Sequence, residues 1–297
     1  MDFGRLPSVD GVDFELPAND PVVCDVLQGQ RAPHARVRIG TPRFADPGFA
    51  GTIYPARVRA ADQLGLYARS FDCLELNSTW YGYDRDLLAR WAAQVSGDFR
   101  FLAKLPATIT HEKRLVACDA EIQDFAHALE ALGPTLGLGW ALLPPDFGPR
   151  ALDDLAEFVS RVPFRLAVEL RHPAFFADTG ARSAVFDLFE EHGVSAVLTD
   201  VAGRRDVLHM RITDPRALML RFTGNGLHPS DFTRLDAWIE RIAAWIDAGL
   251  QTLYVCLHQP QEALNVEVAE YLAPRLAARR GLELPVPVRA AQQRDLF

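Results

Sequence analysis

The chain has 297 residues, of which 49% are hydrophobic and 24% are charged, and this composition is typical of a globular protein with one large domain or two small ones. Its formal net charge of -8 disfavours contact with nucleic acid or an anionic membrane unless basic side chains gather locally. The four cysteines are far apart and form no Cys-x-x-Cys pair, which argues against a zinc knuckle or a redox dithiol.

No targeting or membrane segment is evident in the sequence. The first residues, MDFGRLPSVDGVDFELPAND, carry acidic side chains where a signal peptide would carry basic ones, and they lack a continuous apolar core. No later stretch approaches 18 uninterrupted apolar residues. We therefore expect a cytoplasmic protein with reduced thiols and no membrane contact.

From residue 37 onward, short apolar runs rich in β-formers alternate with longer stretches of helical period, which is typical of a parallel sheet with crossover helices. The runs predicted to be strands are 37–40, 73–76, 99–104, 139–143, 165–170, 195–199, 218–222 and 252–258. The clearest amphipathic helices are predicted at 84–95, 119–132, 152–162, 181–193 and 230–249. Only the sixth predicted strand is followed by a polar, irregular stretch, DVAGRRDVLHMRITD.

Eight β/α units favour an α/β fold of the (β/α)8 TIM-barrel class over an open doubly wound sheet, which usually has five or six strands. The barrel domain is predicted to span residues 37–280. Residues 1–36 form a Pro-rich, acidic N-terminal extension, which we expect over the bottom or side of the barrel. Residues 281–297 are predicted to be a flexible C-terminal tail.

Function in such a barrel lies at the carboxyl ends of the strands, and polar side chains are concentrated there in this sequence. The candidate catalytic residues are Glu75, Glu169, Asp200 and His111. The candidate ligand-binding residues are Asn77, Lys104, Arg171, His172, Arg221 and His258. A carboxylate beside an arginine is often a structural ion pair, but polar strand ends on six of the eight strands favour a ligand or catalytic site.

Three chemistries fit these residues. Glu75 and Glu169 can act as general acid and base, as paired carboxylates do in sugar-cleaving barrels. Glu75, Glu169, Asp200 and His258 can hold a divalent metal, since carboxylate and imidazole are suitable ligands. Lys104, together with the arginines, can bind a phosphate or carboxylate.

The motifs ELNSTWY, AKLPATITH, LLPPDF, VELRH, LRFTGN and ALN, taken together and in this order, resemble those of the YecE-like family, domain of unknown function 72. The resemblance runs from about Val37 to Leu276. It implies a TIM barrel and a site at its mouth, without an established reaction.

Two classes of function remain open on the sequence. One is an enzyme, a hydrolase, nuclease-like enzyme or sugar-phosphate isomerase with or without a divalent metal, acting on nucleic acid or a small anionic molecule. The other is a non-catalytic protein that binds an anionic ligand at the same mouth.

The last residues, QQRDLF, resemble the peptide that binds the bacterial DNA polymerase sliding clamp. The side chains that carry this resemblance are Gln293, Asp295, Leu296 and Phe297. A Gln amide can bond to a partner's backbone while Leu and Phe fill an apolar pocket. The resemblance implies recruitment to DNA, and the alternative is that the apolar pair packs on the chain's own barrel.

Overall fold

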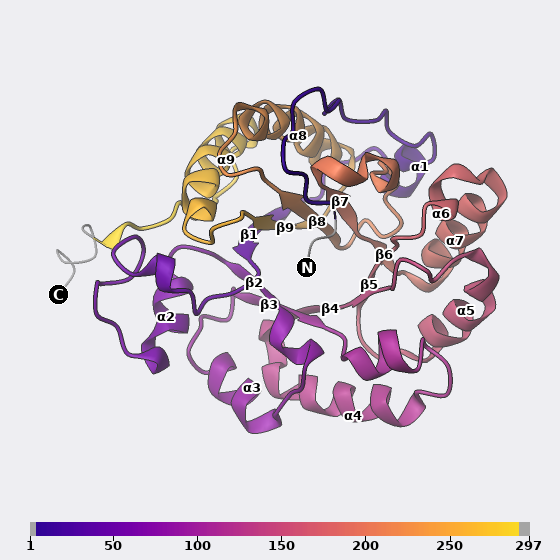
Figure 1. Ribbon diagram of the computed structural model, residues 1–297, viewed down its shortest axis with the longest axis horizontal. Coiled ribbons are helices and arrows are strands. Elements are labelled where there is room, and N and C mark those ends of the chain that lie inside the picture. The colour runs from indigo at the N-terminus through magenta and orange to yellow at the C-terminus, as the bar shows by residue number, and fades with distance from the viewer. Residues whose placement is uncertain (1–3, 291–297) are drawn as a thin grey trace.

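The chain folds into a parallel β-barrel surrounded by helices, as the computed structural model shows for residues 4–290 (Figure 1). The strands of its wall are β1 (Arg36–Thr41), β2 (Cys73–Leu76), β3 (Arg100–Lys104), β4 (Leu136–Leu142), β5 (Leu166–Glu169), β6 (Ser195–Ala196), β7 (Leu198–Asp200), β8 (Leu218–Thr223) and β9 (Thr252–His258). All of their pairings are parallel.

The strand order closes the barrel. The sheet runs β6-β5-β4-β3-β2-β1-β9-β8-β7, so β6 and β7 stand at its two ends. They are nevertheless parts of one chain segment, separated only by Val197, whose backbone N–H donates to the carbonyl of Val168 at 2.9 Å. The nine strands therefore occupy eight positions in the wall, and the predicted α/β barrel with its eight strand regions is confirmed.

Helices cover the outside of the wall in Figure 1. They are α1 (Val23–Leu27), α2 (Gln63–Tyr67), α3 (Arg85–Ala92), α4 (Asp119–Leu129), α5 (Leu152–Arg161), α6 (Ala174–Ala177), α7 (Thr179–His192), α8 (Pro229–Ala248) and α9 (Leu264–Arg280). Where the sequence predicted an irregular stretch after the sixth strand, the chain forms a kinked 3-10 turn, Ala202–Val207. Helix starts follow the chemistry of capping, since Asp84 and Asp178 accept backbone N–H bonds at the first turns of α3 and α7.

Alternation along the strands produces two separate apolar cores. The larger core fills the space between the wall and the helices. The smaller core fills the barrel interior, where its members are Cys73, Leu102, Leu138, Trp140, Leu142, Ala167, Val197, Ala217, Met219, Tyr254 and Cys256. Because side chains alternate across a strand, these residues fix which positions at each strand end point into the barrel.

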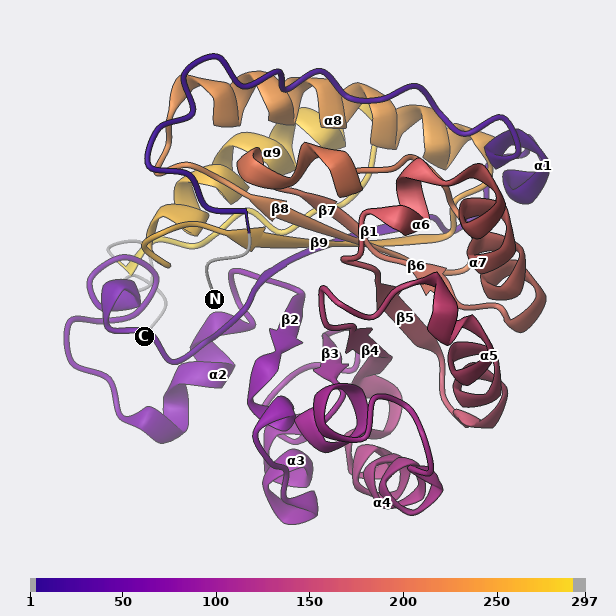
Figure 2. The same cartoon turned by 45° about the vertical axis from the view of Figure 1, so that its right-hand side comes forward.

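The N-terminal extension reaches the carboxyl-end mouth of the barrel, contrary to the expectation that it covers the bottom or side alone. The carbonyl of Gly4 accepts a bond from the N–H of Gly203 at 2.8 Å, and residues 4–10 line the mouth. From there the extension runs outside α8 to α1 (Figure 2). Arg241 on α8 holds it by donating to the carbonyl of Pro17 and to Asn19, both at 2.9 Å.

The segment after α9 packs back on α9 and on the loop that follows β1, as far as Ala290, and in this part it is not a free tether. Arg289 pairs with both carboxylate oxygens of Glu270, at 2.6 and 2.5 Å. The backbone N–H of Ala290 donates to the carbonyl of Thr52 at 2.7 Å. The candidate clamp-binding residues, from Gln293 to Phe297, lie outside the described residues.

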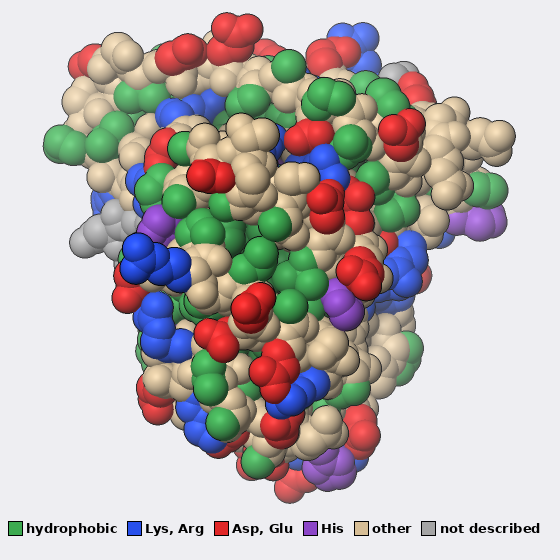
Figure 3. All heavy atoms as spheres, turned by 90° about the vertical axis from the view of Figure 1, so that its right-hand side faces the viewer, with side chains coloured by type: hydrophobic (Ala, Val, Ile, Leu, Met, Phe, Trp, Pro, Cys, Tyr) green, Lys and Arg blue, Asp and Glu red, His purple; other side chains and the backbone are tan. Residues whose placement is uncertain are grey.

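Three further properties bear on possible partners and on redox chemistry. Across residues 4–290, no helix is long and apolar enough to cross a membrane. Acidic and basic side chains are interspersed over the face shown in Figure 3, in keeping with the small excess of acidic residues in the chain. All four cysteines are free thiols.

Candidate functional site

Polar side chains converge above the apolar interior, where the strands end at their carboxyl side. They face an open cavity of about 1320 Å³, and its lining includes Glu75, Lys104, Arg171, Arg221 and His258. Each of these side chains points toward the barrel interior, because side chains alternate along a strand. Four of them follow an apolar interior residue by two positions, and Arg171 follows the inward-facing Glu169 by two positions. The sequence therefore places one charged layer directly on top of one apolar layer.

Arg221 on β8 joins the two buried glutamates. Its Nε and Nη2 atoms donate to Oε2 and Oε1 of Glu75, both at 3.1 Å, and its Nη1 donates to Oε2 of Glu169 at 2.8 Å. Both carboxylates are at most 1% exposed. A planar guanidinium suits this double contact because its N–H groups form a rigid fork.

Burial and ion pairing act in opposite directions on these carboxyls. Burial alone raises the pKa of Glu75, but the charges of Arg221 and His258 outweigh it and hold the pKa well below its usual value. Burial likewise opposes ionisation of Glu169, and Arg221 and Arg171 lower its pKa below the usual value. Both glutamates are therefore ionised at neutral pH.

Two neighbours occupy the remaining sites on Glu75. Nε2 of His258 lies 2.9 Å from Oε2, and Nδ2 of Asn77 donates to Oε1 at 2.9 Å. Since an ionised carboxylate only accepts hydrogen bonds, Nε2 of His258 carries the proton in this contact. Arg171 binds the second carboxylate in the same way, donating from Nε to Oε1 of Glu169 at 2.9 Å.

Lys104 at the end of β3 is different, because its ammonium faces aromatic rings. Nζ lies 5.2 Å from the ring centroid of Trp80 and 5.1 Å from that of Trp140, within the range of cation–π attraction. The residue is 5% exposed, and among residues 4–290 its Nζ forms no ion pair with a carboxylate. Burial and the charges of Arg221 and Arg171 outweigh the attraction of the two glutamates and lower the pKa of Lys104 to about 8.

A model of the family described as "Protein of unknown function DUF72" matches residues 38–293. The chain belongs to the DUF72 family. It is 31% identical over 257 residues to the UPF0759 protein YecE of Escherichia coli strain K12, across 80% of this chain and 91% of the relative. The protein of the same name from Escherichia coli O157:H7 gives the same values.

The DUF72 fold is also seen in a solved relative. A crystal structure of a DUF72 family protein from Enterococcus faecalis V583 matches with a TM-score of 0.66, at 16% identity, over 84% of this chain and 96% of that one. A likeness at this identity shows the fold alone. It agrees with the barrel described above.

Asp200 does not join the charged layer of the DUF72 barrel. Its carboxylate binds Arg205, Nη2 of Arg234 at 3.0 Å and the indole N–H of Trp238 at 2.7 Å. Thr199 and Val201, which flank it, line the mouth, so Asp200 points outward to α8. The prediction that Asp200 belongs to the mouth is wrong, because Asp200 ends its strand with the opposite parity to the inward residues.

The four predicted metal ligands consequently do not form one set. Asp200 is on the outside of the wall, and the two glutamates are bound by arginines. Among the described residues, no group of three or more His, Cys, Asp or Glu side chains is placed to hold a metal ion.

The two other predicted histidines lie beside the site and do not line the cavity. His111, on the π-helical turn Thr108–Glu112, makes an edge contact with Trp80 at 5.3 Å between centroids. Burial and the charge of Lys104 lower its pKa. His172 accepts the N–H of Ala174 through Nδ1 at 3.1 Å, at the start of α6.

Sequence reasoning missed the two tryptophans that surround the lysine. Trp140 precedes the end of β4 and alternates with Leu138 and Leu142 in the interior, so strand parity contained a signal for it. Trp80 is part of the ELNSTWY stretch, but nothing in its local sequence pattern predicts that it contacts the lysine. Both indole N–H groups are buried, and in the described part of the chain neither has a hydrogen-bond partner.

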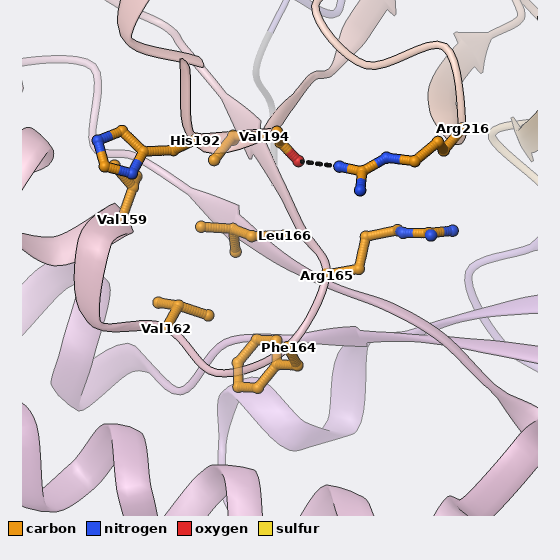
Figure 4. A pocket seen from close by; sticks show the side chains of 9 residues that line it. Val159, Val162, Phe164, Arg165, Leu166, His192, Val194 and Arg216 are labelled. Carbon is orange, nitrogen blue, oxygen red and sulfur yellow. Dashed lines mark hydrogen bonds between the residues drawn. The ribbon is translucent and has the colours of Figure 1, made fainter. Parts of the chain in front are cut away.

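A second cavity, of about 280 Å³, lies at the opposite end of the barrel, where residues at or just before the starts of β5, β6 and β8 line it; Figure 4 shows it from close by. Apolar side chains such as Val159, Phe164 and Leu166 line one side of it. Arg216 faces it, but its guanidinium is bound to Asp214 and to the carbonyl of Gly193. Because sites of barrel enzymes lie at the carboxyl ends of the strands, the mouth is the candidate site.

Proposed function

We propose that the barrel binds a small anionic molecule, one that carries a phosphate or a carboxylate, in the mouth cavity. One observation supports this most directly: the buried layer holds the cations Lys104, Arg171 and Arg221 against the carboxylates Glu75 and Glu169. The glutamates are bound by the arginines, so the charge of Lys104 has no carboxylate partner within residues 4–290. A buried charge without a counter-ion is costly, and an anionic ligand supplies one.

The same geometry disfavours hydrolysis by paired carboxylates. That mechanism needs one carboxyl that holds a proton at working pH. Arg221 contacts both Glu75 and Glu169, and the pKa of each is lowered. The pair therefore serves to position Arg221 and Arg171 at the mouth.

A small ligand is favoured over an extended nucleic acid. The three cations are at the floor of a cavity and the two arginines are paired, whereas a phosphate backbone is bound by basic side chains spread over an exposed surface. The net charge of -8 has the wrong sign for long-range attraction of DNA.

Calorimetric titration with inorganic phosphate tests the proposal. We expect saturable binding, and we expect Lys104→Met to weaken it about tenfold or more, since a hydrogen bond to a charged group contributes about 1.5–3 kcal/mol. Lys113→Met is the matched control, because Lys113 lies on the surface and pairs with Glu121 at 2.7 Å. Equal affinity in both variants, or no binding in the intact protein, would contradict the proposal.

For the C-terminal peptide we propose docking on the sliding clamp, as its resemblance implies. Ala290 is held by the carbonyl of Thr52 in the loop after β1, and only two residues separate this anchor from Gln293. Removing Leu296 and Phe297 is expected to abolish binding in a titration with purified clamp. Unchanged binding after the removal, or none by the intact chain, would refute docking through this peptide.

A further inference from the structure

Lysine is rare in this chain, and one of its lysines lies at the mouth. Of 31 Lys and Arg residues, only Lys104 and Lys113 are lysines. Lys113 is on the surface, where Nζ donates to the carbonyl of Ala117 at 2.9 Å and pairs with Glu121. Nearly every other position that needs a cation uses arginine, so the choice at Lys104 calls for a chemical reason.

The buried cations among the described residues fall into two groups, according to the kind of side chain that they contact. The buried arginines each form an ion pair with a carboxylate; they are Arg38, Arg171, Arg211 and Arg234. Lys104 is the buried cation that faces two indole rings instead. Arginine keeps its charge at any working pH, whereas the amine of a lysine can lose its proton when it is buried. The position without a carboxylate thus carries the cation that can become a neutral nucleophile.

We propose that Lys104 forms an imine with the carbonyl carbon of an anionic ligand, a small keto or aldehyde compound that carries a carboxylate or a phosphate. This inference rests on the proposed anion site and adds a covalent step to it. Lys104 is among the residues that line the cavity, so a carbonyl group bound there lies next to this side chain. Arg171 and Arg221 line the same cavity and add positive charge beside Lys104, which favours a ligand that carries an anionic group.

The step balances without a further reagent. The lone pair of the neutral amine bonds to the carbonyl carbon, the C=O π electrons move to the oxygen, and the first amine proton moves to that oxygen to give a carbinolamine. Loss of the second amine proton and departure of the hydroxyl group as water then leave the C=N bond. A pKa of about 8 leaves a useful fraction of Lys104 as free amine near neutral pH.

Several charged groups face this amine and set its reactivity. Arg221 and Arg171 favour the neutral form, whereas Glu75 and Glu169 favour the charged form. His111 makes an edge contact with Trp80, one of the two rings beside this amine. Since burial and the arginines prevail, we expect imine formation to increase as the pH rises through about 8.

Reductive trapping tests the inference. The full chain is incubated with pyruvate or with dihydroxyacetone phosphate, then with sodium borohydride, whose hydride reduces an imine to a stable secondary amine. Peptide mapping by mass spectrometry should find the adduct on Lys104 at least tenfold above any on Lys113. Acetone, which has the carbonyl group without the anion, should label Lys104 at least tenfold less.

Two variants show which lysine carries the adduct. Lys104→Arg should remove the adduct and Lys113→Arg should leave it unchanged. The imine proposal is wrong if neither probe gives an adduct on Lys104, or if only Lys113 or the α-amino group is labelled. In that case, phosphate binding by the intact protein would still support the anion site. Loss of phosphate binding as well would refute the anion site itself.

Discussion

Glu75 accepts bonds from Asn77, Arg221 and His258 while it is fully buried. This number of donors keeps the carboxylate charged in the barrel interior, where burial alone would favour the protonated form. The arrangement also fixes the guanidinium of Arg221 across the mouth. Stability and site geometry therefore depend on the same contacts.

Replacing Glu75 by Gln should destabilise the protein strongly. Breaking one partner of a buried ion pair typically costs about 3–5 kcal/mol, because the remaining charge is left uncompensated. The free energy of unfolding in urea measures this. Glu240→Gln is the control, since Glu240 pairs with Arg279 on the exposed surface and such a pair contributes about 0–1 kcal/mol. Similar losses in the two variants would show that the mouth network contributes little.

The protonation of Lys104 predicts how anion binding depends on pH. Its pKa is about 8 before ligand binds, so the ammonium loses its charge as the pH rises from about 7 to about 9.5. Affinity for sulfate, which keeps its own charge over this range, should fall across this window. The fall should be absent in Lys104→Met, and the same fall in both proteins would assign the pH dependence to another group.

At the level of elements, His209 connects the stretch after the 3-10 turn to α6 and α7. Its ring stacks on Phe176 and lies 5.0 Å from the ring of Phe186, between centroids. Nε2 contacts the carbonyl of Val197 at 3.2 Å, and Nδ1 accepts the N–H of Arg211. Burial lowers the pKa of His209 to about 3, so the folded protein keeps this ring neutral.

This histidine should make the fold sensitive to acid. The unfolded chain takes up a proton at His209 near the usual pKa of 6.5 and the folded chain only near 3, so stability is lost as the pH falls between these values. The loss approaches about 1.4 kcal/mol for each pH unit. Urea unfolding of the intact protein and of His209→Gln, at several values of pH, isolates this group from Asp72, whose raised pKa has the opposite effect. The prediction is contradicted if the free energy of unfolding changes with pH by the same slope in the intact protein and in His209→Gln.

Periodicity identified the elements well, because burial in a barrel imposes regular patterns. Predicted strands 73–76 and 252–258 coincide with β2 and β9. Predicted helix 152–162 ends within one residue of α5. The N-terminal extension had no comparable pattern, and its place at the mouth depends on tertiary contacts such as that between Gly4 and Gly203.

The site was only partly predictable, and parity explains the difference. Glu75, Glu169, Arg171, Arg221 and His258 have inward parity and come together. Asp200 ends its strand with outward parity, so the strand-end rule alone misplaced it. The pairing of the charges depends on distances between strands across the barrel, and so do the ring neighbours of Lys104. Patterns within one strand do not report such distances.

For the whole molecule, the barrel combines an acidic chain with an excess of positive charge at the floor of its mouth. The apolar interior closes the barrel below the charged layer, and residues 4–10 contribute to the rim. This shape allows a small anion to reach Lys104, and the net charge of -8 disfavours long-range attraction of polyanions.

A crystal soaked in selenate shows whether an anion binds at Lys104, since selenium reports its position by anomalous scattering and selenate resembles sulfate and phosphate. We expect an anomalous peak at the floor of the mouth, with a selenate oxygen within hydrogen-bond distance of Nζ of Lys104, and no such peak in Lys104→Met. A mouth without selenate, with peaks only at surface arginines or in the cavity beside Arg216, would contradict the account.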